Sequence, residues 1–251
     1  MRILILSDIH ANTWALRAAE QDAGAVDYVL CAGDTVNYGP DPHGAIQWLR
    51  ERQALVVRGN HDHAVALEAD PKASPAKQKL ALATRDWTRS VLSPDDLAWL
   101  LALPTGLNCE LHGTRFAVVH ATPWEPLYDY RLTPQAASNL LDRAAVDTAA
   151  DVLVTGHTHL PFAREHKGLM IVNPGSLGQP LDGDPRAAYA IWEEGTIRLC
   201  RVSYDLAPVI DALRRLPLEP RLIDKLAAIL REGRIKCNEI TGVLGDYCDK
   251  D

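Results

Sequence analysis

The chain begins with residues 1–12, MRILILSDIHAN, in which an apolar run leads directly into side chains that bind metals in proteins. The run from Ile3 to Leu6 has the length and the branched side chains of a buried strand. Asp8 and His10 follow it two residues apart, so on an extended backbone both side chains point to the same side. A carboxylate and an imidazole placed in this way can hold one cation.

The same arrangement recurs four more times along the chain. Apolar runs at 28–31, 55–57, 116–119 and 152–154 precede Gly33-Asp34, Gly59-Asn60-His61-Asp62, His120 and Gly156-His157-Thr158-His159. In open α/β sheets ligands bind beyond the carboxyl ends of the strands, so we expect the five motifs to meet in one place. The predicted metal ligands are Asp8, His10, Asp34, Asn60, His120, His157 and His159.

This set is too large for a single tetrahedral metal site. Its three carboxylate or carboxamide groups and four imidazoles suit two adjacent divalent metals that share a bridging carboxylate. Taken singly, each residue has an ordinary explanation: Asp8 as a helix cap, Asn60 as a turn residue and His120 as a buried histidine. Their joint position at the ends of strands favours the metal interpretation.

His61 is the candidate for an acid catalyst. Two metals can bind a phosphate and supply a hydroxide, but the leaving oxygen still needs a proton donor. His61 is adjacent to the predicted ligand Asn60 and is placed to provide that donor. Asp62 either orients His61 or caps the following helix, and capping is the default interpretation.

Composition limits the classes of partner. The 251 residues include 26 basic and 33 acidic side chains, which gives a formal charge of −7, and no Lys/Arg-rich run is present. We therefore expect no stable binding to nucleic acid or to a membrane. The expected partner, a small phosphorylated substrate, follows from the two-metal motifs and not from the composition. An anionic substrate remains compatible with this charge because bound metals supply local positive charge. The oligomeric state cannot be predicted.

The cysteines indicate a reducing compartment. They are scattered and contain no C-x-x-C pair. No apolar run reaches the length of a signal-peptide core or a membrane span, so a cytoplasmic protein is expected. The five positions are Cys31, Cys109, Cys200, Cys237 and Cys248.

The order of predicted elements indicates an α/β protein. In the first half, strands alternate with helices at 13–22 and 43–52, which favours a largely parallel sheet. The second half is richer in hairpins. Residues 64–103 look helical, and further helices are predicted to open at Thr133-Pro134 and to cover 206–216 and 220–231, whereas residues 233–251 carry no interpretable pattern.

Taken together, the motifs resemble those of the calcineurin-like metallophosphoesterases, from Met1 to about Tyr204. The resemblance implies a four-layer α-β-β-α sandwich, in which two mixed sheets are flanked by helices, with a two-metal site. It also implies a metallophosphoesterase domain over 1–204, and we expect residues 205–251 to form a helical extension packed on that domain.

Motif by motif, the resemblance implies a role for each ligand. Asp8, His10, Asp34 and His159 would hold the first metal. Asp34, Asn60, His120 and His157 would hold the second, and His61 would be the catalytic histidine. The expected ions are manganese or iron, with nickel, zinc or magnesium as alternatives.

Other segments are similar to a small bacterial phosphodiesterase-like branch, among them 38–42 and 173–176. The serine/threonine phosphatases instead carry Gly-Asp-x-Val-Asp-Arg-Gly. Here residues 33–39 are Gly-Asp-Thr-Val-Asn-Tyr-Gly, without the phosphate-binding Arg, which argues against protein phosphatase activity. Ala11 stands where the Asp-x-His-Gly-Asn motif has Gly, and Ala fits there unless φ is positive.

The leading functional hypothesis is a phosphodiesterase that hydrolyses small nucleotide-type phosphodiesters by attack of a metal-bound hydroxide. The alternatives are a dinucleoside polyphosphate hydrolase, a phosphomonoesterase, and a scaffold without catalysis, which the complete ligand set argues against. Segments 35–42 and 121–132 directly follow ligands and should lie at the rim of the site. The predicted substrate contacts are Arg131, Tyr38 and Asn12.

Overall fold

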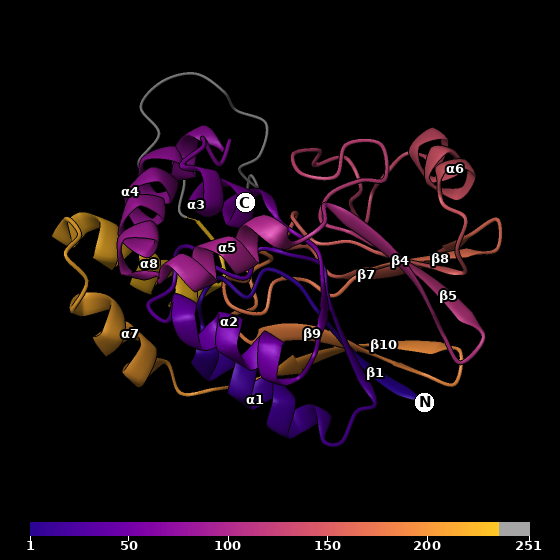
Figure 1. Ribbon diagram of the computed structural model, residues 1–251, viewed down its shortest axis with the longest axis horizontal. Coiled ribbons are helices and arrows are strands. Elements are labelled where there is room, and N and C mark those ends of the chain that lie inside the picture. Colours follow the sequence, from indigo (N-terminus) through magenta and orange to yellow (C-terminus); the bar gives the residue numbers. More distant parts are fainter. Residues whose placement is uncertain (236–251) are drawn as a thin grey trace.

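The structure, a computed structural model, describes residues 1–235, which form two five-stranded sheets with surrounding helices (Figure 1). The first sheet contains β1 (Arg2–Leu6), β2 (Tyr28–Cys31), β3 (Leu55–Val56), β9 (Ala187–Glu193) and β10 (Thr196–Val202). Their order is β10-β9-β1-β2-β3. β1, β2 and β3 are parallel, whereas the β9–β10 hairpin adds antiparallel strands beside β1.

The second sheet is mixed in the same way. It contains β4 (Gly106–Leu111), β5 (Thr114–Val119), β6 (Val152–Val154), β7 (Phe162–His166) and β8 (Leu169–Asn173). The order is β4-β5-β6-β8-β7, with parallel strands in the middle and an antiparallel strand at each edge. The predicted class of two mixed sheets flanked by helices is therefore confirmed.

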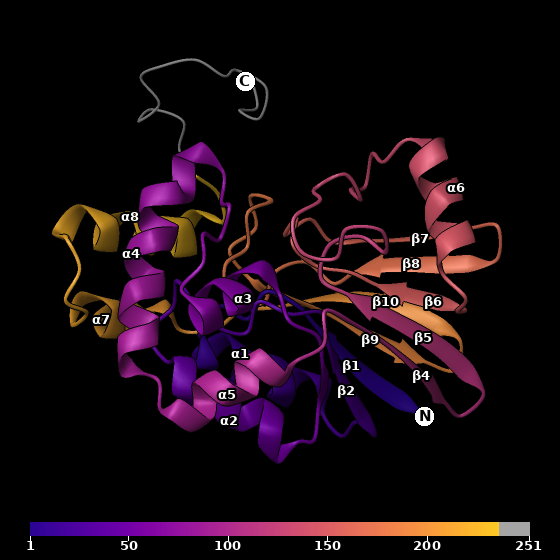
Figure 2. The same ribbon diagram turned by 45° about the horizontal axis from the view of Figure 1, so that its top comes forward.

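Helices cover the outer face of each sheet. α1 (Thr13–Ala23) and α2 (Pro42–Glu51) connect the parallel strands of the first sheet, and α6 (Ser138–Asp147) lies over the second. The remaining helices gather at one end of the sheets, beyond the carboxyl ends of β1 and β2, as both views show (Figures 1 and 2). They are α3 (Asn60–Leu67), α4 (Pro75–Val91), α5 (Pro94–Ala102), α7 (Leu206–Arg214) and α8 (Pro220–Glu232).

The alternation of side chains along β1 explains how the first sheet packs against the second sheet on one face and against helices on the other. Ile3 and Ile5 join the apolar cluster between the two sheets, whereas Leu4 and Leu6 join the cluster under α1 and α2. Side chains on a strand alternate between its faces, so one buried strand serves two cores. Between the sheets, the rings of Phe116 and Trp192 pack edge to face with centroids 5.6 Å apart.

Two helix predictions need correction. The stretch 64–103 is not one helix, because α3 ends at Leu67, its C-cap Glu68 has a left-handed φ of 55°, and Pro71 cannot donate a backbone hydrogen bond. The helix predicted at Thr133-Pro134 is wrong: α6 begins only at Ser138. Residues before it form a turn closed by Ala136, whose side chain is buried in the cluster under α6.

α7 and α8 share an apolar cluster with Leu80 and Ala81 of α4 and with Tyr38. Residues 236–251, which include Cys237 and Cys248, lie outside the described residues, so the division at residue 204 stays a prediction. Cys31, Cys109 and Cys200 are free thiols. Over residues 1–235, none of the helices combines the length and apolar character needed to cross a membrane.

Asn12 ties the start of α1 to two distant segments. Its Oδ1 accepts the Ala15 N–H at 3.1 Å, while its Nδ2 donates to the Gly178 carbonyl at 3.1 Å and to the Tyr204 hydroxyl at 2.9 Å. All three bonds belong to a side chain that is 1% exposed. The predicted substrate contact by Asn12 would therefore compete with bonds that hold the fold.

We expect Asn12→Ala to lower the free energy of unfolding by about 2–4 kcal/mol, because a helix cap and two buried hydrogen bonds are lost together. Urea denaturation measures this change. Asn12→Asp is the matched control, since it keeps the cap acceptor and loses only the donors. Unchanged stability with a raised KM would instead support substrate contact by Asn12.

Candidate metal centre

The seven predicted ligands converge at the carboxyl ends of β1, β2, β3, β5 and β6. None of them is more than 4% exposed. Their loops are joined by the backbone: the Asp8 N–H donates to the Gly33 carbonyl and the His10 N–H to the Asp34 carbonyl, both at 2.9 Å. The loops after the two neighbouring strands therefore form one rigid unit.

Several ligands occupy an uncommon backbone region. A left-handed φ is costly for residues other than Gly, and such strain gathers at functional sites. Ala11 also has a φ of +53°, so the position where the related motif carries Gly does require a left-handed residue. The five ligands in this region are Asp8 (52°), His10 (47°), Asp34 (54°), His157 (67°) and His159 (60°).

The first group of donors surrounds Asp8. His159 Nε2 lies 3.3 Å from Asp8 Oδ1 and 3.3 Å from His10 Nε2. Asp34 Oδ2 is 3.9 Å from His10 Nε2. Asp8, His10 and His159 therefore offer three ligand atoms close enough to hold one metal ion.

The second group surrounds Asn60. Its Oδ1 lies 2.9 Å from His120 Nε2 and 3.1 Å from His157 Nδ1, and those two nitrogens are 3.1 Å apart. The Asn60 Nδ2 donates to the Pro71 carbonyl at 2.7 Å, which turns Oδ1 into the site. Asp34 Oδ2 lies 3.4 Å from His120 Nε2, so the same oxygen faces both groups.

Backbone carbonyls set the tautomer of three histidines. Nδ1 of His120 lies 2.7 Å from the Ala32 carbonyl, Nδ1 of His159 lies 2.6 Å from that of Gln179, and Nδ1 of His10 lies 3.3 Å from that of Val36. A carbonyl only accepts, so each Nδ1 donates and each neutral ring presents its Nε2 lone pair to the site.

These lone pairs point at other acceptors. In their neutral forms, His10 and His159 present two bare Nε2 atoms to each other, and Asp8 Oδ1 has no hydrogen-bond partner among the described residues. Contacts between acceptors are unfavourable unless a cation or a proton lies between them. Because the donors are imidazole, carboxylate and amide, the set fits divalent metals.

Charge within the site shifts its pKa values strongly. Burial raises the pKa of Asp34, but the nearby His120 and His61 rings outweigh burial and hold that pKa well below its usual value. Burial also lowers the pKa of His120, yet Asp34 outweighs it and raises the pKa to about 9. Asp34 is therefore ionised at neutral pH and available to a cation.

His61 lies on the first turn of α3, beside the two groups of metal donors, but its ring bonds to a residue outside both groups. Its Nδ1 is 2.7 Å from Asn37 Nδ2. The Asn37 amide is oriented by the Tyr38 N–H, which donates to its Oδ1 at 2.8 Å, and by the Ala81 carbonyl 3.3 Å from its Nδ2. Asn37 therefore donates to His61 Nδ1, which leaves the ring proton on Nε2.

The environment of His61 also favours its neutral form. Burial lowers the pKa of His61 to about 4. Its backbone N–H donates to Asp34 Oδ1 at 2.8 Å, so α3 fixes the second oxygen of that carboxylate. Asp62 caps α3 as the default interpretation predicted: its Oδ2 accepts the Gly59 N–H at 3.0 Å, and its Oδ1 accepts the Val36 N–H at 3.1 Å.

The predicted substrate contacts are placed unequally. The ring of Tyr38 packs on His10 and His61, with centroids 4.9 and 4.7 Å away, and its buried hydroxyl has no partner among the described residues. Arg131 is exposed and pairs with Asp129 at 2.6 Å. Among residues 1–235, Arg131 contacts Asp129 and the Trp124 ring but none of the ligand groups, so its role stays a prediction.

Sequence reasoning did not single out three neighbours of the site. The ring of Tyr130 stacks on His157 with centroids 3.8 Å apart, which places part of segment 121–132 at the rim as expected. Asn37 could have been found, since it stands where the phosphatase motif has its second Asp. Lys77 of α4 gave no signal, because no motif surrounds it.

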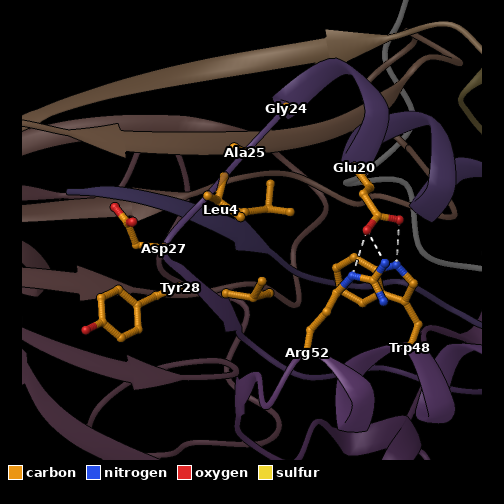
Figure 3. Close-up of a pocket in the computed structure, with 10 residues that line it drawn as sticks. Leu4, Glu20, Gly24, Ala25, Asp27, Tyr28, Trp48 and Arg52 are labelled. Carbon is orange, nitrogen blue, oxygen red and sulfur yellow. Dashed lines mark hydrogen bonds and ion pairs between the residues drawn. The ribbon is translucent and has the colours of Figure 1, made fainter.

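A separate cavity lies away from these residues. It has a volume of about 270 Å³ and is lined by residues such as Leu4, Asp27 and Tyr28 (Figure 3). Its polar groups are already paired: Glu20 accepts from Trp48 Nε1 at 2.9 Å and from Arg52 Nε at 2.7 Å. It adjoins the start of β2, not the carboxyl end, and contains none of the predicted ligands, so we assign it no role.

Comparison with known proteins gives the family. Residues 1–196 match the calcineurin-like phosphoesterase superfamily domain. The chain therefore belongs to this superfamily, whose members are metallophosphoesterases, and it is a hydrolase acting on phosphoester bonds. The expected family is thus confirmed, and with it a need for divalent metal that the Asp and His groups described above can meet.

Similar proteins span nearly the whole chain. An uncharacterized protein of Methanocaldococcus jannaschii is 29% identical over 237 residues, which cover 86% of this chain and 93% of that protein. A metallophosphoesterase from Sphaerobacter thermophilus is 32% identical with a TM-score of 0.76, covering 91% of this chain and 99% of that one. A hypothetical protein from Pyrococcus horikoshii OT3 shares the fold at 20% identity, with a TM-score of 0.80 and coverage of 94% and 99%.

Gly59 has no room for a side chain. A Cβ built there would lie 2.1 Å from Asp34 Oδ1 and 2.4 Å from the Asp34 backbone nitrogen. We expect Gly59→Ala to lower the free energy of unfolding of the metal-free chain by about 1–3 kcal/mol, as overpacking does, and to reduce metal content by displacing Asp34. Denaturation and elemental analysis measure both effects. Gly106→Ala is the control, because the atom nearest to its Cβ would be Val119 Cγ1, at 3.2 Å. Equal effects of the two substitutions would contradict the steric explanation.

Proposed function

We propose that the chain is a two-metal phosphodiesterase acting on small nucleotide-type phosphodiesters, as in the phosphodiesterase-like branch that its sequence resembles. The observation that carries the proposal is the position of Asp34 Oδ2, which lies 3.9 Å from His10 Nε2 in one donor group and 3.4 Å from His120 Nε2 in the other. A carboxylate in this position suits a bridge between two metals.

The two donor groups would hold one metal each. Asp8, His10 and His159 would complete the first site with Asp34, and Asn60, His120 and His157 would complete the second. Bound divalent ions supply positive charge for phosphoryl oxygens and lower the pKa of a bound water. The ligand set fits manganese or iron, with nickel, zinc or magnesium as alternatives.

His61 would stabilise the leaving oxygen by hydrogen bonding. Because Asn37 donates to Nδ1, the neutral ring carries its hydrogen on Nε2. Nε2–H can donate a hydrogen bond to the oxygen that departs from phosphorus and stabilise its negative charge, while the proton that this oxygen finally takes comes from water. Asn37 holds the ring in one orientation and is a positioning residue, because it acts through His61.

A second candidate substrate is a dinucleoside polyphosphate. It is favoured by one observation, the buried cation of Lys77 near the site, because such substrates carry additional negative charges. Both candidates are small phosphorylated molecules, and the chain's charge of −7 still argues against a nucleic acid partner. Tyr38, Arg131 and Asn12 remain the proposed substrate contacts from the sequence.

We expect the manganese-loaded chain to bind about two ions and to hydrolyse bis(p-nitrophenyl) phosphate faster than p-nitrophenyl phosphate. Because ligands that bind only the native state stabilise it, chelation should lower the melting temperature. Elemental analysis, the two rates and a thermal scan test these points. One ion per chain after reconstitution, or a faster monoester reaction, would contradict the two-metal phosphodiesterase.

We expect His61→Ala to retain the metals and to reduce kcat by roughly 10²–10⁴-fold, the usual contribution of a positioned acid. The loss should be smaller for substrates with good leaving groups, which need less protonation. The exposed His112→Ala is the control and should behave as the wild type. If His61→Ala empties the site of metal, His61 is a ligand and not the acid.

A further inference from the structure

Lys77 is a buried cation without a partner. It lies on the first turn of α4 and is only 8% exposed. Within residues 1–235 its ammonium makes no ion pair or hydrogen bond, and its nearest described aromatic contact is the ring of Tyr38, 5.8 Å from Nζ to the centroid. Nζ keeps some contact with water, so a ligand can reach it, but a lysine side chain this deeply buried usually has a partner.

The ammonium faces the metal centre. The Tyr38 ring beneath it packs on His10 and His61. Burial lowers the pKa of Lys77, and the carboxylates of Asp8 and Asp34 act against burial. Lys77 in turn contributes to the lowered pKa of His61. The charges that act on its ammonium are therefore those of the site, although Lys77 comes from a helix outside every ligand motif.

Metal binding changes the net charge around Lys77. This step rests on the proposed function. Without metals, Asp8 and Asp34 offset only part of the cost of burying the ammonium, because neither carboxylate pairs with it. Two divalent ions carry four positive charges against these two carboxylates, so the loaded site is positive and Lys77 adds to that excess. A further anion beside Nζ would balance it, and a phosphorylated substrate carries such an anion.

We propose that Lys77 is a substrate-binding residue whose ammonium binds a non-bridging phosphoryl oxygen, together with the unpartnered hydroxyl of Tyr38. Tyr38 stands where the related phosphatase motif has an Arg, so α4 supplies the cation that the loop after Asp34 lacks. The class of ligand is a phosphate group whose oxygens extend beyond those held by the metals.

The test compares Lys77→Met with Lys79→Met. Met keeps the length of the buried side chain and removes its charge. Lys79 lies on the same helix, but it is exposed and pairs with Glu219 at 3.0 Å. Inorganic phosphate is the probe, and its Kd for the manganese-loaded protein is measured by calorimetry, beside metal content and the melting temperature of the metal-free protein.

We expect Lys77→Met to weaken phosphate binding by about 10- to 100-fold, the range for loss of a charged hydrogen bond. Metal content should stay unchanged. The metal-free variant should melt at the same or a higher temperature, because an unpaired buried charge is gone. Lys77→Arg should recover part of the affinity, and Lys79→Met should match the wild type.

Two results would overturn the proposal. If the wild type and Lys77→Met bind phosphate equally, Lys77 does not contact the substrate. If Lys77→Met loses metal or melts at a lower temperature while phosphate still binds, Lys77 is a structural counter-charge for Asp8 and Asp34. Either result leaves the two-metal phosphodiesterase standing, since the metal content and diester hydrolysis of the wild type test that function independently.

Discussion

The site depends on the direct contact of backbones at the ends of the strands. A Cβ on Gly33 would lie 2.6 Å from the Gly59 nitrogen, and one on Gly59 would lie 2.4 Å from the Asp34 nitrogen. Only glycine allows this approach. It brings ligand atoms from separate strands within 3–4 Å of one another, and the left-handed ligands that result are each strained by about 1–3 kcal/mol. Hydrogen bonds between loops, such as His10 N–H to Asp34 at 2.9 Å, hold the strained conformation.

The strands and the metal-type side chains could be predicted because their signals are local. An apolar run such as 116–119, followed at once by His120, predicts both a strand and the position of its carboxyl end. Parallel topology brings such ends together. The pairing of donors within the site needed coordinates. That Asp34 Oδ2 faces both groups depends on the His61 N–H holding the other oxygen at 2.8 Å, a contact that no periodicity reveals.

Where prediction from sequence failed, tertiary packing outweighed a local signal. Thr133-Pro134 has the composition of a helix start, but the burial of Ala136 under α6 requires a turn, and the helix begins later. Ala11 adopts a positive φ although the residue disfavours it, because its N–H donates to the Thr35 carbonyl and its carbonyl accepts the Asp41 N–H. Lys77 is the extreme case, since only its position over Tyr38 distinguishes it from an ordinary helix lysine.

These features explain how an acidic chain can select an anion. The formal charge of −7 is spread over the surface, whereas the site gathers imidazoles, two carboxylates and one buried ammonium where water is largely excluded. Without metals this arrangement costs stability, through left-handed backbone, facing acceptors and an unpaired lysine. Bound metals would separate the facing acceptors, and a phosphate at Lys77, as proposed above, would balance the lysine, so both ligands would also stabilise the fold. Strain and buried charge that destabilise the metal-free protein would in this way favour the binding of metal and phosphate.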